Sequence, residues 1–265
     1  MPSSTNSQFI AFFGATGGCT NACLVHTLNA GYHVTALART PSKLIDMLHA
    51  QGVNQTVIDT QLTIVKGDIA DLPAIKSVLT NNTYGTSEIK VASQILSGVG
   101  GTPKLNKSFK KPVTIDNPEI CAQTTKNIVQ ALNEIQASNK PSITVISTTG
   151  VSDVREDVPF GFRFMYHVIL ADPHKDKKVM ERIITENSST ERGVFKGAII
   201  IRPSLLAGDQ DVKTGKGWKK LKVGVEEKPA VGYTVGRQDV GEWIFEQVIK
   251  TGGESHFGQR ITLTN

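Results

Sequence analysis

The chain has 265 residues, of which 39% are hydrophobic and 20% are charged, and its formal net charge is +5. This length suffices for one large α/β domain, and the composition excludes a disordered or fibrous protein. No stretch approaches the roughly 20 apolar residues of a membrane span, and the positive charge is scattered apart from a lysine cluster within 213–222. We therefore expect neither a membrane nor a nucleic-acid partner.

The cysteines and the first residues indicate the compartment. Cys19, Cys23 and Cys121 have neither the number of a disulfide framework nor the spacing of a metal site. They are typical of a reduced, intracellular protein. The first residues, MPSSTNSQ, lack the apolar core of a signal peptide. We expect a cytoplasmic protein that carries no metal.

Apolar and β-branched runs alternate with amphipathic stretches along the chain. Strands are predicted at 9–13, 34–37, 62–65, 89–96, 143–146 and 198–201, and helices at 21–30, 41–50, 72–79, 120–135 and 240–248. Such alternation predicts βαβ units, and therefore a parallel sheet with helices on both faces. Two loop-rich segments, 98–118 and 207–235, interrupt this pattern without resembling an interdomain linker.

The glycines of the first turn predict a site for a dinucleotide. Gly14, Gly17 and Gly18 stand between the first strand and the first helix. There they permit a tight turn and let backbone N–H groups approach a pyrophosphate at the helix N-terminus. The alternative is a purely structural βα turn.

The second strand ends at Arg39, about 20 residues further on, where an acidic residue would bind the ribose 2′-hydroxyl of NAD. An arginine accommodates a 2′-phosphate instead, and Ser42 and Lys43 add a hydroxyl and a second cation. These residues favour NADP(H), although Arg39 alone could be an ordinary surface arginine.

These motifs define the expected architecture. We predict an α/β fold, a single Rossmann-type doubly wound parallel sheet with helices on both faces. It forms one domain over residues 1–265, with a cofactor-binding core at about 8–155. A small C-terminal substrate-binding region, at about 156–240, is interleaved with that core.

The chain resembles the atypical short-chain dehydrogenase/reductase family, and within it the biliverdin-reductase-B-like and NmrA-like branch. The resemblance is carried by GATGGCT (14–20), ART with PSKL (38–44), Gly67-Asp68, STTGVS (147–152) and IRPSLLAGD (201–209). It implies that Asp68 contacts the adenine and that the loop from Ser97 to Gly100 follows the nicotinamide ribose. Thr20 replaces the third turn glycine of the family, and its hydroxyl could donate to a phosphate. The further cofactor contacts expected from the resemblance are Thr16, Cys19, Ile69, Gly98, Val99, Thr148, Lys178 and Pro203.

The catalytic motif of the family is absent in its usual form. Related reductases use Tyr-x-x-x-Lys with a Ser or Thr at the end of the fifth strand, for which Thr149, and next Thr148, is the matching hydroxyl here. Tyr166 is followed four residues later by Leu170 rather than by lysine.

A substitute for that motif follows in ADPHKDKKVMERII. Asp172 is a suitable N-cap, Pro173 suits the first helical position, and His174 and Lys178 are four residues apart on one helix face. We therefore expect His174 and Lys178 to replace the tyrosine–lysine pair. The alternatives are an exposed, charged first turn, a site based on Tyr166, and a reaction without a side-chain acid.

The resulting functional hypothesis is an NADP(H)-dependent oxidoreductase that reduces a small carbonyl, imine or conjugated substrate. Segments 160–168 and 218–233 are candidates for substrate contacts. Two alternatives stay open: a non-redox cyclase or isomerase that retains NADP(H), and an NmrA-like dinucleotide sensor without turnover. The expected partner is a small molecule, and the expected assembly is a monomer or a homodimer.

Overall fold

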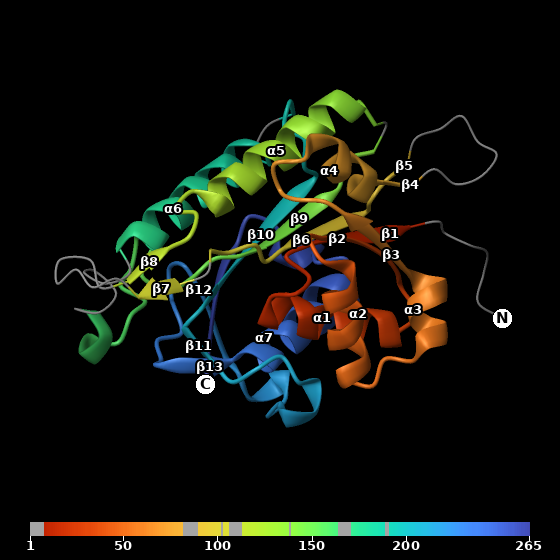
Figure 1. Cartoon of the computed structure of the whole chain (residues 1–265). Helices are drawn as coiled ribbons and strands as arrows, with labels where there is room; N and C mark the ends of the chain where they lie inside the picture. The colour runs from red at the N-terminus through yellow and green to blue at the C-terminus, as the bar shows by residue number, and fades with distance from the viewer. Residues whose placement is uncertain are drawn as a thin grey trace.

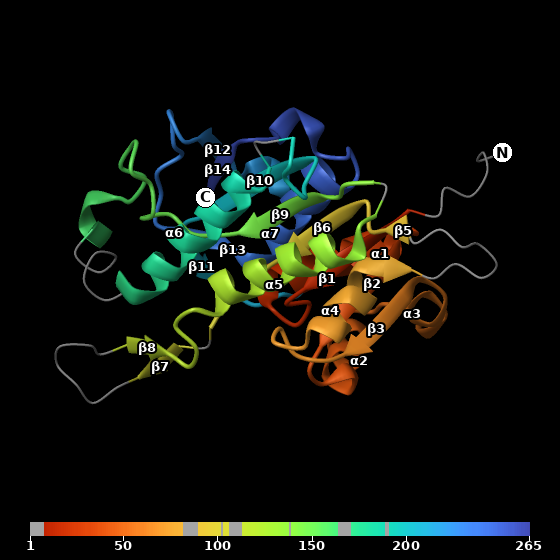
Figure 2. The ribbon, with the colours of Figure 1, turned by 90° about the horizontal axis from the view of Figure 1, so that it is seen from above.

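The structure is a computed structural model of the chain, and it describes residues 8–81, 90–101, 103–105, 113–137, 139–163, 171–188 and 191–265. A sheet of eight strands runs through the middle of the molecule (Figures 1 and 2). In spatial order it contains β12 (Lys222–Val225), β14 (Arg260–Thr264), β10 (Gly197–Pro203), β9 (Ser142–Ile146), β6 (Gln94–Ser97), β1 (Phe9–Phe13), β2 (His33–Ala38) and β3 (Leu62–Lys66). All neighbours pair in parallel except the edge strand β12, which is antiparallel to β14.

Helices cover both faces of this sheet (Figure 1). On one face lie α1 (Gly18–Asn29), α2 (Pro41–Ala50), α3 (Gln55–Gln61) and α7 (Arg237–Ile244), which continues as a π-helical stretch at Phe245–Ile249. On the other face lie α4 (Leu72–Leu79), α5 (Ile120–Ile135) and α6 (Ala171–Glu186). Three two-stranded pairs complete the described strands: β4 (Thr80–Asn81) with β5 (Lys90–Val91), β7 (Pro103–Leu105) with β8 (Val113–Ile115), and β11 (Leu205–Ala207) with β13 (Thr234–Gly236).

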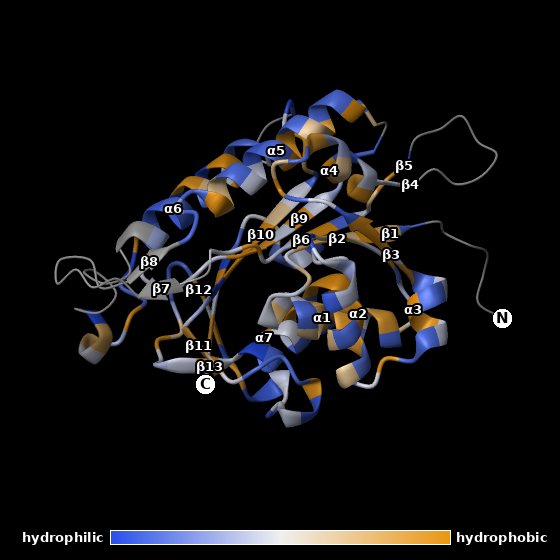
Figure 3. Cartoon of the chain, viewed as in Figure 1, coloured by the Kyte–Doolittle hydropathy of each residue, from blue (hydrophilic) through white to orange (hydrophobic). Residues whose placement is uncertain are grey.

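The alternation of side chains along β1 explains why both faces must be covered. Phe9, Ala11 and Phe13 join the core beneath α4, α5 and α6, whereas Ile10 and Phe12 join the core beneath α1, α2 and α7. Successive side chains of a strand point to opposite faces, so an apolar strand is buried only between two helical layers. The apolar residues accordingly gather on the sheet and on the inner sides of the helices (Figure 3).

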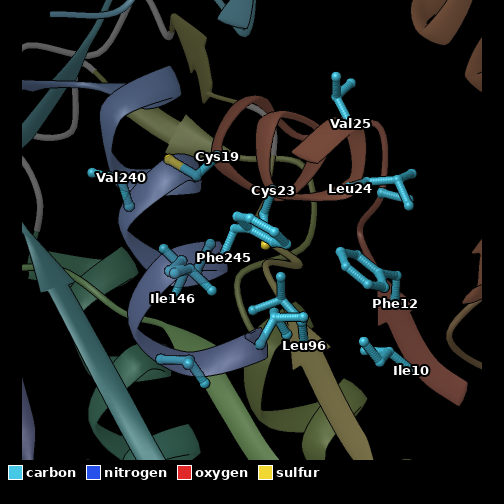
Figure 4. Close-up of a cluster of buried hydrophobic side chains, with 14 of the residues drawn as sticks. Ile10, Phe12, Cys19, Cys23, Leu24, Val25, Leu96, Ile146, Val240 and Phe245 are labelled. Atoms are coloured by element: carbon cyan, nitrogen blue, oxygen red, sulfur yellow. The ribbon is translucent and has the colours of Figure 1, made fainter. Parts of the chain in front are cut away.

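Close packing of α1 against α7 fixes the helix that follows the glycine turn. Cys19 and Cys23 of α1 lie beside Val240 and Phe245 (Figure 4). Gly241 permits this approach, because a Cβ there would lie 2.6 Å from both the Ala22 Cβ and the Cys19 carbonyl oxygen.

The predicted fold class is confirmed, and several predicted segments require correction. The expected strand at 89–96 is two short strands, β5 and β6, and the loop-rich segment 207–235 contains the edge strand β12. The helix expected from Asp172 is already formed at Ala171, so Asp172 is not its N-cap. Within the described part of the chain, no helix is long and apolar enough to cross a membrane.

Candidate functional site

The order of the strands reverses between β1 and β6, which makes this the point where a doubly wound sheet binds its ligand. A cavity of about 300 Å³ opens there, at the carboxyl ends of the strands. It is lined by the glycine turn, the end of β2, and the loops after β3 and β6. The lining residues are Gly14, Thr16, Gly17, Leu37, Ala38, Arg39, Lys43, Gly67, Asp68, Ile69, Gly98, Val99, Gly100 and Ile120.

The glycine turn has the geometry of a phosphate-binding turn. Gly14 has φ +78°, and a Cβ there would lie 2.9 Å from the backbone of Gly98, so only glycine fits. Gly17 is the N-cap of α1, its N–H donates to the Gly14 carbonyl at 2.8 Å, and no side chain caps this helix. The first N–H groups of α1 therefore remain available to an anion, and the residues present fit a dinucleotide.

The wall formed by β2 and β3 carries two cations. Arg39 and Lys43 both line the cavity, and neither pairs with a carboxylate among the described residues. Asp68 is held in place because its Oδ1 accepts a hydrogen bond from the Ala70 N–H at 3.1 Å. Ser42 is exposed and lies outside the cavity lining.

Other residues expected at the cofactor are placed elsewhere. Gly18 lies against the side chain of Arg237, and a Cβ on Gly98 would overlap the Thr20 hydroxyl, which is buried behind the loop after β6. Cys19 is a core residue of α1, and burial raises the pKa of its thiol to about 12. These corrections have one cause: residues 19 and 20 are on the side of α1 that faces the protein.

Two further residues expected at the cofactor, Ser97 at the end of β6 and Pro203 at the end of β10, are also outside the cavity lining. Ser97 is buried within the sheet, and the Pro203 carbonyl accepts a hydrogen bond from the Thr149 N–H at 3.1 Å.

Two adjacent lysines of α6 have opposite surroundings. The Lys177 ammonium donates to the carbonyl oxygens of Ile146, at 2.7 Å, and Val99, at 3.4 Å. Ile146 ends β9 and Val99 lines the cavity, so Lys177 is beside the switch point. Lys178 is 43% exposed and donates to Asp153 at 2.5 Å.

The structure does not bring Lys178 to the cavity at the switch point, and the role expected for it with His174 stays a prediction. Lys178 lines a different cavity, of about 440 Å³, whose walls also include Glu181 of α6, Arg202 of β10 and Arg260 of β14. His174 is buried, with 7% exposure, one turn before Lys177. Sequence reasoning missed Lys177, although it stands three and seven residues before the buried Met180 and Ile184, a spacing that indicates the inner face of the helix.

A buried ion network holds α6 against the sheet. Glu181 accepts from Arg202 through both carboxylate oxygens, at 3.0 and 2.6 Å, and from the Ser147 hydroxyl at 2.5 Å. Arg202 also donates to Glu226 at 3.0 Å, and Arg260 contacts both glutamates, at 3.6 and 3.2 Å. Burial is the largest single effect and opposes the charge of Arg202, but the hydrogen bonds and charges of Glu181 and Glu226 together outweigh it, and the pKa of the guanidinium is raised.

A second acidic residue of α6 positions the neighbouring helix. The Asp176 carboxylate accepts hydrogen bonds from the N–H groups of Cys121, at 2.9 Å, and Ala122, at 2.8 Å. The first turn of α5 contains no acidic residue of its own, so Asp176 caps that helix from outside.

The hydroxyls after β9 are distributed over different environments. Ser147 is committed to Glu181, Thr149 is fully buried, and Thr148 is half-buried and hence the more accessible of the two predicted threonines. Tyr166, the other predicted acid, lies outside the described residues.

The two segments expected at the substrate meet through aromatic side chains. Phe162 and Tyr233 make an edge-on contact with ring centroids 5.0 Å apart, and Phe160 is 86% exposed nearby in sequence. Trp218 instead packs against the core, and its backbone N–H donates to the Glu242 carboxylate at 2.9 Å. Among the residues the structure describes, no cluster of three or more His, Cys, Asp or Glu residues could hold a metal ion.

Comparisons with known proteins agree with this geometry. Residues 14–251 match the model of the NAD(P)H-binding family. "Reductase pytE" of Aspergillus terreus is 45% identical, over 98% of this chain and 99% of its own length. "Oxidase pynE" of Aspergillus niger is 42% identical, over 96% and 98%. A short-chain dehydrogenase/reductase from Veillonella parvula, solved in complex with NADP, has the same fold, with a TM-score of 0.66 at 15% identity over 97% of this chain and 94% of that one.

Proposed function

Because the chain belongs to the NAD(P)H-binding family, we propose that it is an NADP(H)-dependent oxidoreductase acting on a small carbonyl, imine or conjugated acceptor. The similarity to proteins named a reductase and an oxidase supports the redox class. The observation that carries the proposal is the cavity at the switch point, which combines a phosphate-binding turn with two cations and has the Lys177 ammonium beside it, at the carbonyls of Ile146 and Val99.

The cofactor preference rests on the end of β2. Arg39 and Lys43 place positive charge on the wall where the adenosine ribose of a bound dinucleotide lies in this fold. Asp68 is the one acidic residue of the cavity lining, and it follows β3 rather than β2. This arrangement favours a 2′-phosphate over a free 2′-hydroxyl.

The bound cofactor supplies or accepts a hydride at its nicotinamide ring. Lys177 places its positive charge at the ends of β6 and β9, where it favours the cofactor ribose and any negative charge that develops on the substrate. His174 is buried one turn before Lys177 on the same helix, and we assign it to donate a hydrogen bond or a proton to the acceptor atom. Besides His174, the Thr148 hydroxyl is a second possible donor to the acceptor atom.

Arg39→Asp tests the cofactor preference. In the unmodified protein, NADP⁺ is expected to bind more tightly than NAD⁺, because a charged contact to the 2′-phosphate contributes about 1.5–3 kcal/mol. The substitution should abolish or reverse that preference. Titration calorimetry with both cofactors measures it, and equal affinities in the unmodified protein would refute the assignment.

The reaction class is tested by measuring how many moles of NADPH are oxidised per mole of product formed. A panel of small carbonyl, imine and conjugated acceptors is incubated with NADPH, and nicotinamide absorbance and product are followed together. One NADPH oxidised per product supports the oxidoreductase. Tight cofactor binding without turnover on any acceptor, together with a protein partner, would instead indicate a sensor.

A non-redox isomerase or cyclase that retains NADP(H) is the second candidate. It is favoured by Pro173: if Lys177 takes the lysine position of a Tyr-x-x-x-Lys motif, Pro173 stands in the tyrosine position. Proline supplies no proton. Product formation without any change in NADPH would identify this alternative.

A further inference from the structure

Arg237, the first residue of α7, lies across the glycine turn at the start of α1. A Cβ added to Gly18 would lie 2.3 Å from the Arg237 Cδ and 3.3 Å from its Cβ. The stem of the arginine thus occupies the space that a side chain at position 18 would need. The absence of a side chain at position 18 therefore makes room for Arg237 of α7, and not directly for the cofactor.

The charge of Arg237 has no counter-charge in the described part of the protein. One guanidinium nitrogen, Nη1, donates to the Gly208 carbonyl, and no carboxylate pairs with the group. The two acidic residues of α7 are engaged elsewhere: Asp239 accepts from the backbone N–H of Gly217, and Glu242 accepts from the backbone N–H of Trp218, both at 2.9 Å.

This cation lies beside the positive end of a helix dipole. The N-terminus of α1 carries unpaired N–H groups, and α1 has neither an acidic residue in its first turn nor a side-chain cap. A permanent cation beside such a terminus is unfavourable by itself, and a bound anion relieves it. The charge of Arg237 also lowers the pKa of the Cys19 thiol, although burial raises that pKa by more. This effect is consistent with a guanidinium near the start of α1.

We propose that Arg237 is the counter-charge of the cofactor pyrophosphate. Its guanidinium supplements the N–H groups of the glycine turn, and its bond to Gly208 ties the segment after β11 to the same anion. The proposal rests on dinucleotide binding, which family membership establishes, and not on the proposed redox reaction. It divides the anionic recognition of NADP(H) between Arg237 for the pyrophosphate and Arg39 for the 2′-phosphate.

The experiment compares Arg237→Met with Arg39→Met, each of which keeps an unbranched stem and removes one charge. Titration calorimetry measures the affinities of NADP⁺, NAD⁺ and 2′-AMP, the last of which has a 2′-phosphate but no pyrophosphate. Arg237→Met should weaken NADP⁺ and NAD⁺ equally, by about ten- to hundredfold, and leave 2′-AMP unchanged. Arg39→Met should weaken NADP⁺ and 2′-AMP and leave NAD⁺ unchanged.

Unchanged NAD⁺ affinity in Arg237→Met would overturn the proposal, and so would an equal loss of 2′-AMP, which would show a structural role. If Arg237→Met fails to fold, Gly18→Ala takes its place, because the added methyl displaces the arginine and keeps its charge. The same selective loss of both dinucleotides is then expected, and normal NAD⁺ binding would refute it. Turnover is not needed, so the outcome is independent of the reaction class.

Discussion

Two neighbouring lysines show how a single residue's direction decides its function. Successive residues of a helix are rotated by about 100°. Lys177 consequently contacts the ends of β9 and β6, while Lys178 pairs with the exposed Asp153. Four-residue spacing made Lys178 the natural partner of His174 in the sequence. The spacing of Lys177 from Met180 and Ile184 indicates the inner face of the helix, but it could not identify the carbonyls that Lys177 contacts, because they belong to segments far away in the chain.

Lys177→Met and Lys178→Met form a matched pair of substitutions. Lys177→Met leaves the Ile146 carbonyl without its donor and removes the charge at the proposed ribose site. It should weaken NADP⁺ binding about tenfold or more. Lys178→Met should leave that affinity within about twofold, because an exposed ion pair contributes only about 0–1 kcal/mol. Calorimetry on both variants measures this, and equal losses would contradict the assignment.

At the scale of elements, the sequence predicted the helices with local signals most accurately. The bounds expected for α2, α4 and α5 coincide with those observed. Pro41 and Pro73 occupy first-turn positions, and Asp71 caps α4 through the Ala74 N–H. The burial of charged residues on α6 was not predictable in this way, because they are stabilised by partners distant in the sequence, such as Arg202 for Glu181.

In the candidate site, too, the residues that belong to local motifs were predicted, and those placed by distant contacts were not. The cavity-lining residues that were predicted, such as Gly14, Arg39 and Asp68, belong to motifs set directly after strands. Thr20 and Cys19 were misplaced because a motif match does not say which side of α1 faces the protein. The contact of Arg237 with Gly18 could not be predicted from a motif, because the two residues are far apart in the sequence.

Glu181→Gln tests whether the ion network holds α6. The substitution leaves Arg202, which is 3% exposed, with an incomplete set of buried partners. Breaking a buried pair in this way costs about 3–5 kcal/mol of unfolding free energy. Glu186→Gln is the control on the same helix, since Glu186 pairs with the exposed Arg182 and the loss of that pair should cost less than about 0.5 kcal/mol. Urea unfolding measures both, and similar values would mean that the network contributes little.

At the scale of the whole molecule, the cofactor cavity lies where the two helical layers meet the sheet. Cys19 and Cys23 are buried in the layer of α1 and α7, and Cys121 is buried in the layer of α5 and α6. Cys121 donates its thiol hydrogen to the Val99 carbonyl at 3.3 Å, so it adjoins the cavity from its own layer. Both layers therefore contribute to the walls that a bound dinucleotide would contact.

Thiol reactivity should consequently report cofactor binding from both layers. Burial raises the pKa of Cys19 to about 12 and that of Cys121 to about 11, so neither thiol should react with a disulfide reagent in the closed native protein. Reaction requires opening, and a ligand that binds only the closed state slows it by the factor 1 + [L]/Kd. At NADP⁺ concentrations of about 100 Kd, we expect about hundredfold slower labelling of Cys19 and of Cys121, each measured in a variant whose other cysteines are alanine. Slower labelling of Cys19 with an unchanged rate for Cys121 would show that the α5–α6 layer opens independently of the cofactor site.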